Sequence, residues 1–184
     1  MSVFGKLRAV QDDDVMMLLA WRNHPDIRQK MYNAHIISET EHLEWWRHAR
    51  EREDRRYFIY ERDGEPSGSM AITAIDGQNS RANWGFYLSP NALRGSGSRM
   101  NFLALRYVFD DLKLNKLCGE VLSSNGKSIR LHQRLGFSIE GVLREHHRVD
   151  GKFEDVHLFG LLRDEWRRAK NAIEASLIEL EGRT

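Results

Sequence analysis

The sequence predicts a mixed α/β fold, because hairpin turns and amphipathic helical segments follow one another along the chain. Strand-like runs flank three Asp-Gly pairs, a dipeptide that favours tight hairpin turns: Asp63-Gly64, Asp76-Gly77 and Asp150-Gly151. Apolar residues at helical spacing fill several of the intervals between strands. Together these features predict one domain over residues 1–184. It would contain an antiparallel meander, a strand–loop–helix unit, a parallel strand followed by a helix, and a final hairpin.

The sequence of the N-terminal third predicts one strand and several helical segments. A short strand over residues 5–10 precedes a helix that Asp12 or Asp13 caps. That helix stops near Pro25, which disfavours helical geometry in the residue before it. A further helical turn is expected around residues 27–32. The capping box over residues 38–41 starts a helix over residues 39–50, with Leu43 and Trp46 facing inward.

The rest of the chain alternates between strands and helices. Strands are expected over residues 56–61, 68–75, 81–88, 117–122, 138–149 and 153–162. One helix opens after the glycine turn at residues 94–97, and another runs from residue 124 or 125 to 135, where Gly136 ends it. Asp164 starts a C-terminal helix with one apolar face, formed by Trp166, Ile173, Leu177 and Leu180.

The composition is that of a soluble globular protein. Of its 184 residues, 41% are hydrophobic and 30% are charged, and a formal net charge of +1 gives no attraction to nucleic acid or membrane. No apolar run approaches the ~20 residues that span a bilayer, and the single Cys118 is compatible with a reducing compartment. We therefore expect a cytoplasmic protein. The C-terminal helix could pack on its own sheet or on a second copy, so a monomer and a homodimer are both open.

A glycine-bearing turn at residues 94–97 lies between a strand-like run and an amphipathic helix. A helix that begins behind such a turn presents unpaired N–H groups and the positive end of its dipole. Glycine also allows a phosphate to approach the main chain closely. The segment contains neither the Gly-Lys-Ser/Thr ending of a Walker loop nor the three-glycine spacing of a dinucleotide loop. It therefore predicts an anion-binding platform of another kind.

The turn resembles the acetyl-CoA loop of the GNAT acetyltransferases, Arg/Gln-x-x-Gly-x-Gly/Ala. Arg94 and Gly97 are in register, and Arg99 replaces the last small residue. Residues 125–137 resemble a second motif of that family, Asn-x-x-Ser/Ala-x-x-x-Tyr-x-x-x-Gly-Phe, in which His132 replaces the tyrosine. The resemblance implies a GNAT fold, with a central, mostly antiparallel sheet and helices on both faces. It also implies acetyl-CoA as co-substrate, held by Leu88, Arg94, Gly95, Ser96, Gly97, Ser98, Arg99, Asn125 and Ser128.

A closer resemblance covers residues 15–162. Segments 19–25, 31–32, 56–58, 68–70, 87–90 and 140–141 are similar to sugar-nucleotide acetyltransferases of the PseH type. Those enzymes transfer acetyl from acetyl-CoA to the 4-amino group of a UDP-linked 4-amino-4,6-dideoxy sugar in pseudaminic acid biosynthesis. The resemblance implies the same acceptor here.

Acetyl transfer to an amine requires a base, donors for the developing oxyanion, and an acid for the departing thiolate. Glu120, on a strand directed toward the acetyl-CoA site, is the candidate base, although it could merely orient Arg22 or Ser69. His132 is the candidate acid, or else a solvent-facing residue of an amphipathic helix. Ser69 could hydrogen-bond the amine or the sugar, or could be only a small strand residue.

The sugar nucleotide would contact Arg22, Asn23, His42 and Tyr87. Arg22 could pair with a phosphate, or could form a surface ion pair. Tyr87 could stack on the sugar or base, or could belong to the core. His42 could hydrogen-bond the sugar, or could only complete a helix face. The histidines lack metal-ligand spacing with carboxylates or cysteine, so no metal is expected.

Other functions remain open at this point. The chain could be a GNAT enzyme that acetylates a protein N-terminus or a polyamine, although a polyamine site would need a pocket lined with carboxylates. It could also be a GNAT-like fold without catalysis, since Arg99 and His132 depart from the motifs. A nucleic-acid module is disfavoured, because the charge is balanced and no basic aromatic face is evident.

Overall fold

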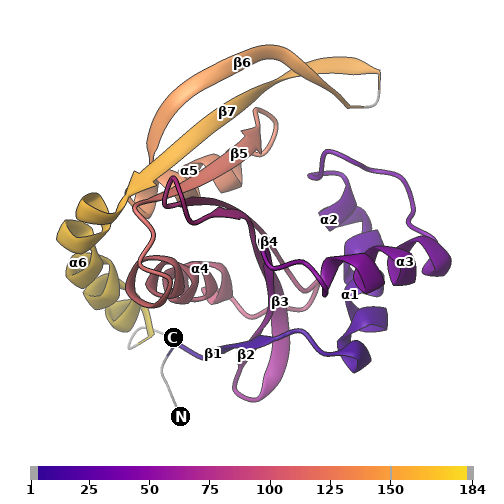
Figure 1. Cartoon of the computed structure of the whole chain (residues 1–184), viewed down its shortest axis with the longest axis horizontal. Helices are drawn as coiled ribbons and strands as arrows, with labels where there is room; N and C mark the ends of the chain where they lie inside the picture. Colours follow the sequence, from indigo (N-terminus) through magenta and orange to yellow (C-terminus); the bar gives the residue numbers. More distant parts are fainter. Residues whose placement is uncertain (1–3, 150, 182–184) are drawn as a thin grey trace.

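The computed structural model describes residues 4–149 and 151–181, with the side chains of residues 180 and 181 excepted (Figure 1). Its centre is a seven-stranded sheet in the order β1-β2-β3-β4-β5-β7-β6. Every neighbouring pair is antiparallel except β4 and β5. This confirms the mixed α/β fold with a mostly antiparallel sheet. The strands are β1 Lys6–Ala9, β2 Arg56–Arg62, β3 Glu65–Asp76, β4 Arg81–Leu88, β5 Lys116–Leu122, β6 Ser138–Val149 and β7 Lys152–Leu162.

Helices cover both faces of the sheet (Figure 1). On one face lie α1 (Val15–Asn23), α2 (Pro25–Arg28) and α3 (Glu39–Ala49), with a 3₁₀ turn, η1 (Asp12–Asp14), before α1. On the other lie α4 (Ser96–Arg106), which continues into a π-helical turn η2 (Tyr107–Asp111), α5 (Gly126–Arg134) and α6 (Arg163–Glu181). Because strand side chains alternate between faces, each face has its own core. Met70, Trp84 and Phe102 belong to the core under α4 and α6, whereas Ile59, Trp46 and Tyr87 belong to the one under α1 and α3.

The strands β4 and β5 separate soon after they meet. Their parallel pairing runs only from Arg81 and Lys116 to Asn83 and Cys118. Beyond that point β4 continues against β3 to Leu88, and β5 continues against β7 to Leu122. The sheet therefore opens between β4 and β5, with the first turns of α4 and α5 beside the opening.

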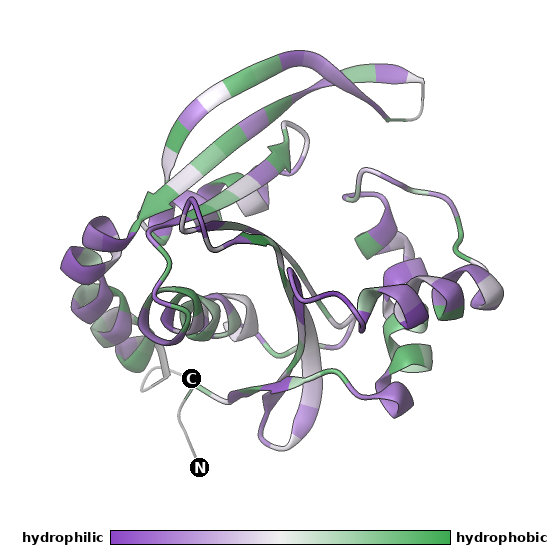
Figure 2. Ribbon diagram, in the orientation of Figure 1, coloured by the Kyte–Doolittle hydropathy of each residue, from purple (hydrophilic) through white to green (hydrophobic). Residues whose placement is uncertain are grey.

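The apolar face predicted for the C-terminal helix is confirmed for three residues. Trp166 and Leu177 are buried, and Ile173 packs against the same core. The side chain of Leu180 lies outside the described residues, as does Asp150 in the turn predicted between β6 and β7. Figure 2 shows α6 and the β6–β7 hairpin with hydrophilic and hydrophobic residues interspersed, as expected of elements with one buried side.

Two local predictions in the N-terminal third are wrong. Leu43 is 45% exposed, because α3 contacts α1 through His42 and Trp46 and turns Leu43 away. Asp12 and Asp13 do not cap α1, which begins at Val15. Asp14 precedes α1 instead, and its carboxylate accepts two hydrogen bonds from the Arg8 guanidinium, at 2.6 and 2.7 Å.

Candidate active site

A cavity of about 610 Å³ occupies the opening between β4 and β5. Its walls come from the ends of both strands, the first turn of α4 at Gly97, the inner face of α5, and residues 26–32 before α3. The cavity thus connects the predicted acetyl-CoA loop to the sheet face that carries α1 and α3. An acetyl donor bound at the loop and an acetyl acceptor bound on that face would meet in the cavity.

The glycine turn before α4 has the geometry that an anion-binding loop requires. Gly95 adopts a left-handed conformation, with φ at 86°, immediately before the helix begins at Ser96. A Cβ on Gly97 would approach Leu88 Cδ1 to 3.4 Å, so glycine leaves the backbone of α4 close to the end of β4. Arg62 on β2 donates to the carbonyl of Arg94 at 2.8 Å and steadies the turn. These features fit a pyrophosphate placed at the α4 N-terminus.

The predicted acetyl-CoA residues divide into two groups. Leu88, Gly97, Asn125 and Ser128 line the cavity, whereas the other five, Arg94, Gly95, Ser96, Ser98 and Arg99, do not. Arg99 is only 4% exposed, and its guanidinium lies inward near Gly95. The inward position gives no support to the expectation that this side chain contacts a phosphate.

The α5 motif folds as its sequence indicates. The side chain of Asn125 caps the helix by accepting from Ser128 N at 3.2 Å, and Gly136, with φ at 89°, follows its end. His132, by contrast, is 2% exposed, so the solvent-facing alternative is wrong. Its Nδ1 donates to the carbonyl of Ser128 at 2.8 Å, and its Nε2 accepts from the Trp84 indole at 3.2 Å. Burial lowers the pKa of His132, which favours this neutral form.

Glu120 meets a residue that sequence reasoning missed. The Tyr32 hydroxyl donates to Glu120 Oε2 at 2.8 Å, across 88 positions of the chain, and both residues line the cavity. The sequence indicated a helical turn and a resemblance to the PseH type at residues 31–32, but no role for Tyr32. Burial and the hydrogen bond to Glu120 raise the pKa of Tyr32 above its ordinary value.

The segment that carries Tyr32 is held in place from both sides. His147 on β6 donates from Nε2 to the carbonyl of Tyr32 at 2.7 Å, and the two rings lie 4.6 Å apart. On the other side, Arg22 donates to the carbonyl of Asn33 at 2.6 Å. Asn23 exchanges two hydrogen bonds with the backbone of Ile37, each of 2.8 Å. The side-chain amide of Asn23 is therefore committed to the loop, which does not support its predicted contact with the acceptor.

Three of the predicted acceptor residues gather on the α1 face of the sheet. Ser69 and Tyr87 are register partners on β3 and β4. Burial raises the pKa of Tyr87 to about 12, and the Ser69 hydroxyl and the nearby charge of Arg22 oppose that rise. Arg22 Nη1 is buried and has no hydrogen-bond partner among the described residues. A buried guanidinium nitrogen without an acceptor is costly. Tyr87 lines the cavity but Arg22 and Ser69 do not, so Arg22 would have to turn toward the cavity wall at Tyr87 to bind an acidic or carbonyl oxygen of a ligand.

His42 lies in helix packing. It is 5% exposed, its Nε2 donates to the carbonyl of Val15 at 3.0 Å, and its ring stacks on Trp45. Burial lowers the pKa of His42. This placement favours the alternative in which His42 completes a helix face, against direct contact with a sugar.

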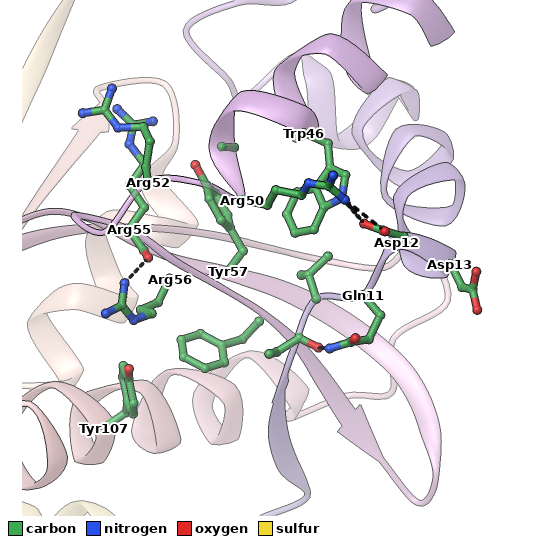
Figure 3. A pocket seen from close by; sticks show the side chains of 14 residues that line it. Gln11, Asp12, Asp13, Trp46, Arg50, Arg52, Arg55, Arg56, Tyr57 and Tyr107 are labelled. Atoms are coloured by element: carbon green, nitrogen blue, oxygen red, sulfur yellow. Dashed lines mark hydrogen bonds and ion pairs between the residues drawn. The ribbon is translucent and has the colours of Figure 1, made fainter.

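A second cavity, of about 720 Å³, lies at the start of β2 (Figure 3). Arginines line it, but they make local contacts: Arg50 pairs with Asp12, Arg52 pairs with Asp54, and Arg56 donates to nearby backbone carbonyls. None of the residues predicted for catalysis or binding lines this cavity.

Within residues 4–149 and 151–181, no three or more His, Cys, Asp or Glu side chains are grouped so as to hold a metal ion. In the same part of the chain, no helix has the length and apolar content needed to cross a membrane.

Comparison with known proteins identifies the family. Residues 6–138 match the model of the acetyltransferase (GNAT) domain. The acetyltransferase PseH of Campylobacter jejuni is 30% identical over 130 residues, 71% of this chain and 80% of its own. The spermidine N(1)-acetyltransferase of Escherichia coli is 28% identical over 153 residues, 82% of each chain.

A solved structure shares the fold. The spermidine N-acetyltransferase of Vibrio cholerae, in complex with CoA and spermine, superposes with a TM-score of 0.84 at 22% identity, covering 90% of this chain and 99% of its own. The glycine turn, the opening between β4 and β5, and the family match all indicate the same family. The chain belongs to the GNAT family and is an N-acetyltransferase that uses acetyl-CoA.

Proposed function

We propose that this enzyme transfers the acetyl group of acetyl-CoA to the 4-amino group of a UDP-linked 4-amino-4,6-dideoxy sugar. The observation that carries the proposal is Arg22, whose buried Nη1 lacks a partner among the described residues and lies near Tyr87. A phosphate or sugar oxygen would satisfy that donor, and the Tyr87 ring could stack on the sugar or base. The 30% identity to PseH over most of both chains supports the same acceptor class.

The charge of the cavity supports an acceptor that is not a polycation. Its charged lining among the described residues consists of Asp26 and Glu120 together with Lys30 and Lys127. Carboxylates and amines are thus in balance, and Arg22 adds positive charge beside Tyr87. A polyamine carries several positive charges and would be favoured by an excess of carboxylates, which this cavity lacks.

The backbone at the end of β4 would orient the thioester. Ser89 N donates to the carbonyl of Ser67 on β3, and successive N–H groups of a strand point to opposite sides. The N–H of Leu88 is therefore directed toward the opening, where it would donate to the thioester carbonyl as negative charge develops. Glu120, on the opposite wall, would accept the proton that the amine loses.

Acetylation of a polyamine is the second candidate, along with acetylation of a protein N-terminus. The relationship to the spermidine acetyltransferase of E. coli, over 82% of both chains, favours the polyamine. In that case Asp26 and Glu120 would bind the cationic amine, and the unpartnered donor of Arg22 would have no role.

The test is release of free coenzyme A thiol with three acceptors: the UDP-4-amino-4,6-dideoxy sugar, spermidine and an N-terminal peptide. The proposal expects turnover with the sugar nucleotide only. Turnover with spermidine or peptide, and none with the sugar nucleotide, would overturn the acceptor while leaving the family assignment intact.

A further inference from the structure

We infer that Tyr32 is a catalytic residue, which together with Glu120 relays a proton from the acceptor amine to the departing thiolate of coenzyme A. The inference rests on the proposed acetyl transfer. It does not depend on which amine is the acceptor. Neither the family motifs nor the sequence pattern assigns a role to Tyr32.

The reaction needs a proton donor at the thiolate. Attack by the amine nitrogen on the thioester carbonyl forms a C–N bond and breaks the C–S bond. The nitrogen must then lose one proton, and the sulfur must gain one. The motif position for that donor holds His132, whose Nδ1 proton is bound to the Ser128 carbonyl and whose Nε2 accepts from Trp84. In this arrangement His132 has no proton free to give.

Tyr32 and Glu120 have the geometry of a relay. The Tyr32 hydroxyl already donates to the Glu120 carboxylate at 2.8 Å, and both lie in the cavity that Leu88 and Gly97 also line. Glu120 takes the proton that the nitrogen loses. The protonated carboxyl then donates to the Tyr32 oxygen, which frees the Tyr32 hydroxyl to turn toward the sulfur. Tyr32 gives its proton to sulfur and takes the carboxyl proton in exchange. One proton leaves nitrogen, one reaches sulfur, and both side chains return to their starting states.

The direction of the relay is favourable. Its net effect is transfer from a carboxylic acid to a thiolate, and ordinary pKa values are about 4 for the acid and about 8.5 for a thiol. Tyr32 alone would be a weak donor, but it gains the carboxyl proton as it releases its own. Tyr32 keeps its proton at neutral pH until the thiolate forms, because a phenol has an ordinary pKa of about 10 and burial together with the Glu120 hydrogen bond raises the pKa of Tyr32 further.

The position of Tyr32 is also fixed by its neighbours, as a proton relay requires. His147 binds the Tyr32 backbone and its ring packs against the phenol, so that β6 fixes Tyr32 above β5. Fixed placement of a proton donor matters because proton transfer requires hydrogen-bond distance in the transition state. His147 is thus a positioning residue.

The test is steady-state kinetics of Tyr32→Phe, Glu120→Gln and the double variant, with whichever amine the wild type acetylates. Failure of the sugar nucleotide as acceptor therefore leaves the relay testable. Removal of a general acid or base lowers kcat by about 10²-fold or more, so each single variant should lose that much at an unchanged Kd for acetyl-CoA. Because the two residues act as a unit, the double variant should lose no more than the worse single variant. Tyr107→Phe, at the second cavity, is the matched control and should keep wild-type kcat.

The outcomes separate a relay from a structural role. Tyr32→Phe removes the hydroxyl but leaves a ring that can still pack on His147. Wild-type kcat in this variant, or a rise in the acceptor KM alone, would therefore overturn the inference. Losses that multiply in the double variant would overturn it too, since they would show two independent effects.

Discussion

The indole N–H of Trp84 donates to Nε2 of His132 at 3.2 Å, in the wall of the cavity between β4 and β5. The imidazole lies T-shaped to Trp84 and stacks on Phe159, with ring centroids 5.4 and 4.7 Å away. His132 thus ties α5 to the sheet, and both of its ring nitrogens are already hydrogen-bonded. The relay inferred above assigns the acid function to Tyr32 instead, through its hydrogen bond to Glu120.

Replacement of His132 by phenylalanine should therefore cost stability more than catalysis. The variant keeps a ring but leaves the Trp84 N–H without its acceptor, whereas the Ser128 carbonyl, inside α5, loses only its side-chain donor. An unsatisfied buried polar group costs about 1–3 kcal/mol, so the free energy of unfolding should fall by about that amount. Urea denaturation and kcat per folded enzyme check this. A loss in kcat of about 10²-fold with normal stability would restore His132 as the acid.

The same burial predicts how stability depends on pH. Burial lowers the pKa of His132 and of His42 in the folded state, so the unfolded chain binds protons more readily at these positions. The free energy of unfolding should fall as pH drops below about 6.5, the ordinary histidine pKa, because protons then favour the unfolded state. In His132→Phe the slope between pH 6.5 and 5 should be shallower by up to one proton. An unchanged slope would mean that His132 titrates normally when folded.

Gly119 leaves room for the pair of Trp84 and His132. A Cβ there would lie 2.8 Å from both Trp84 Nε1 and His132 Nε2, whereas nothing lies within 4 Å of a Cβ on Gly85. Gly119→Ala should destabilise the protein by about 1–3 kcal/mol, as overpacking does. Gly85→Ala, on β4, should change stability little. Thermal or urea unfolding distinguishes the two, and equal effects would contradict the close packing at Gly119.

Arg22 should contribute to binding of the acetyl acceptor and not to binding of acetyl-CoA. Arg22→Met removes a charge-assisted hydrogen bond worth about 1.5–3 kcal/mol, so KM for the sugar nucleotide should rise about 10–100-fold, while KM for acetyl-CoA stays the same. Arg28→Met is the matched control, because Arg28 also donates a hydrogen bond to this loop, to the carbonyl of Ala34 at 2.8 Å. If both variants raise the acceptor KM equally, Arg22 only braces the loop.

His147 should influence the rate through Tyr32. His147→Ala removes the hydrogen bond to the Tyr32 carbonyl and the ring contact, so kcat should fall about 10-fold, less than in Tyr32→Phe. The neighbouring exposed His146 provides the control, and His146→Ala should keep wild-type kcat. In the double variant of Tyr32→Phe with His147→Ala, a further loss as large as that of His147→Ala alone would contradict this positioning role.

The parts of the site that depend on local sequence were predictable. The glycine turn at Gly95, the α4 N-terminus and the Asn125 cap are set by residues within a few positions of each other. The hairpin turns likewise indicated that β2 pairs with β3, β3 with β4, and β6 with β7. The contact between Tyr32 and Glu120 could not be predicted in this way, because the two residues are 88 positions apart and Tyr32 lies in a loop without periodicity.

Burial explains the remaining misses. Helical periodicity placed Leu43 inward, but the contact surface of α3 is formed by His42, Trp46 and Ala49. The sequence left open a solvent-facing His132 and a His42 in contact with the sugar, yet each is buried with a backbone carbonyl as hydrogen-bond partner. Such satisfied histidines depend on the packing of distant segments, which residue type and spacing alone do not determine.

The most direct test of the account is coenzyme A thiol release by the wild-type enzyme, measured as kcat/KM for the UDP-4-amino-4,6-dideoxy sugar and for spermidine under identical conditions. Turnover of the sugar nucleotide at a kcat/KM at least about 10²-fold above that of spermidine, a difference of roughly 2.7 kcal/mol in transition-state binding, is the expected result. Efficient acetylation of spermidine without turnover of the sugar nucleotide would contradict the proposed acceptor and the role given to Arg22.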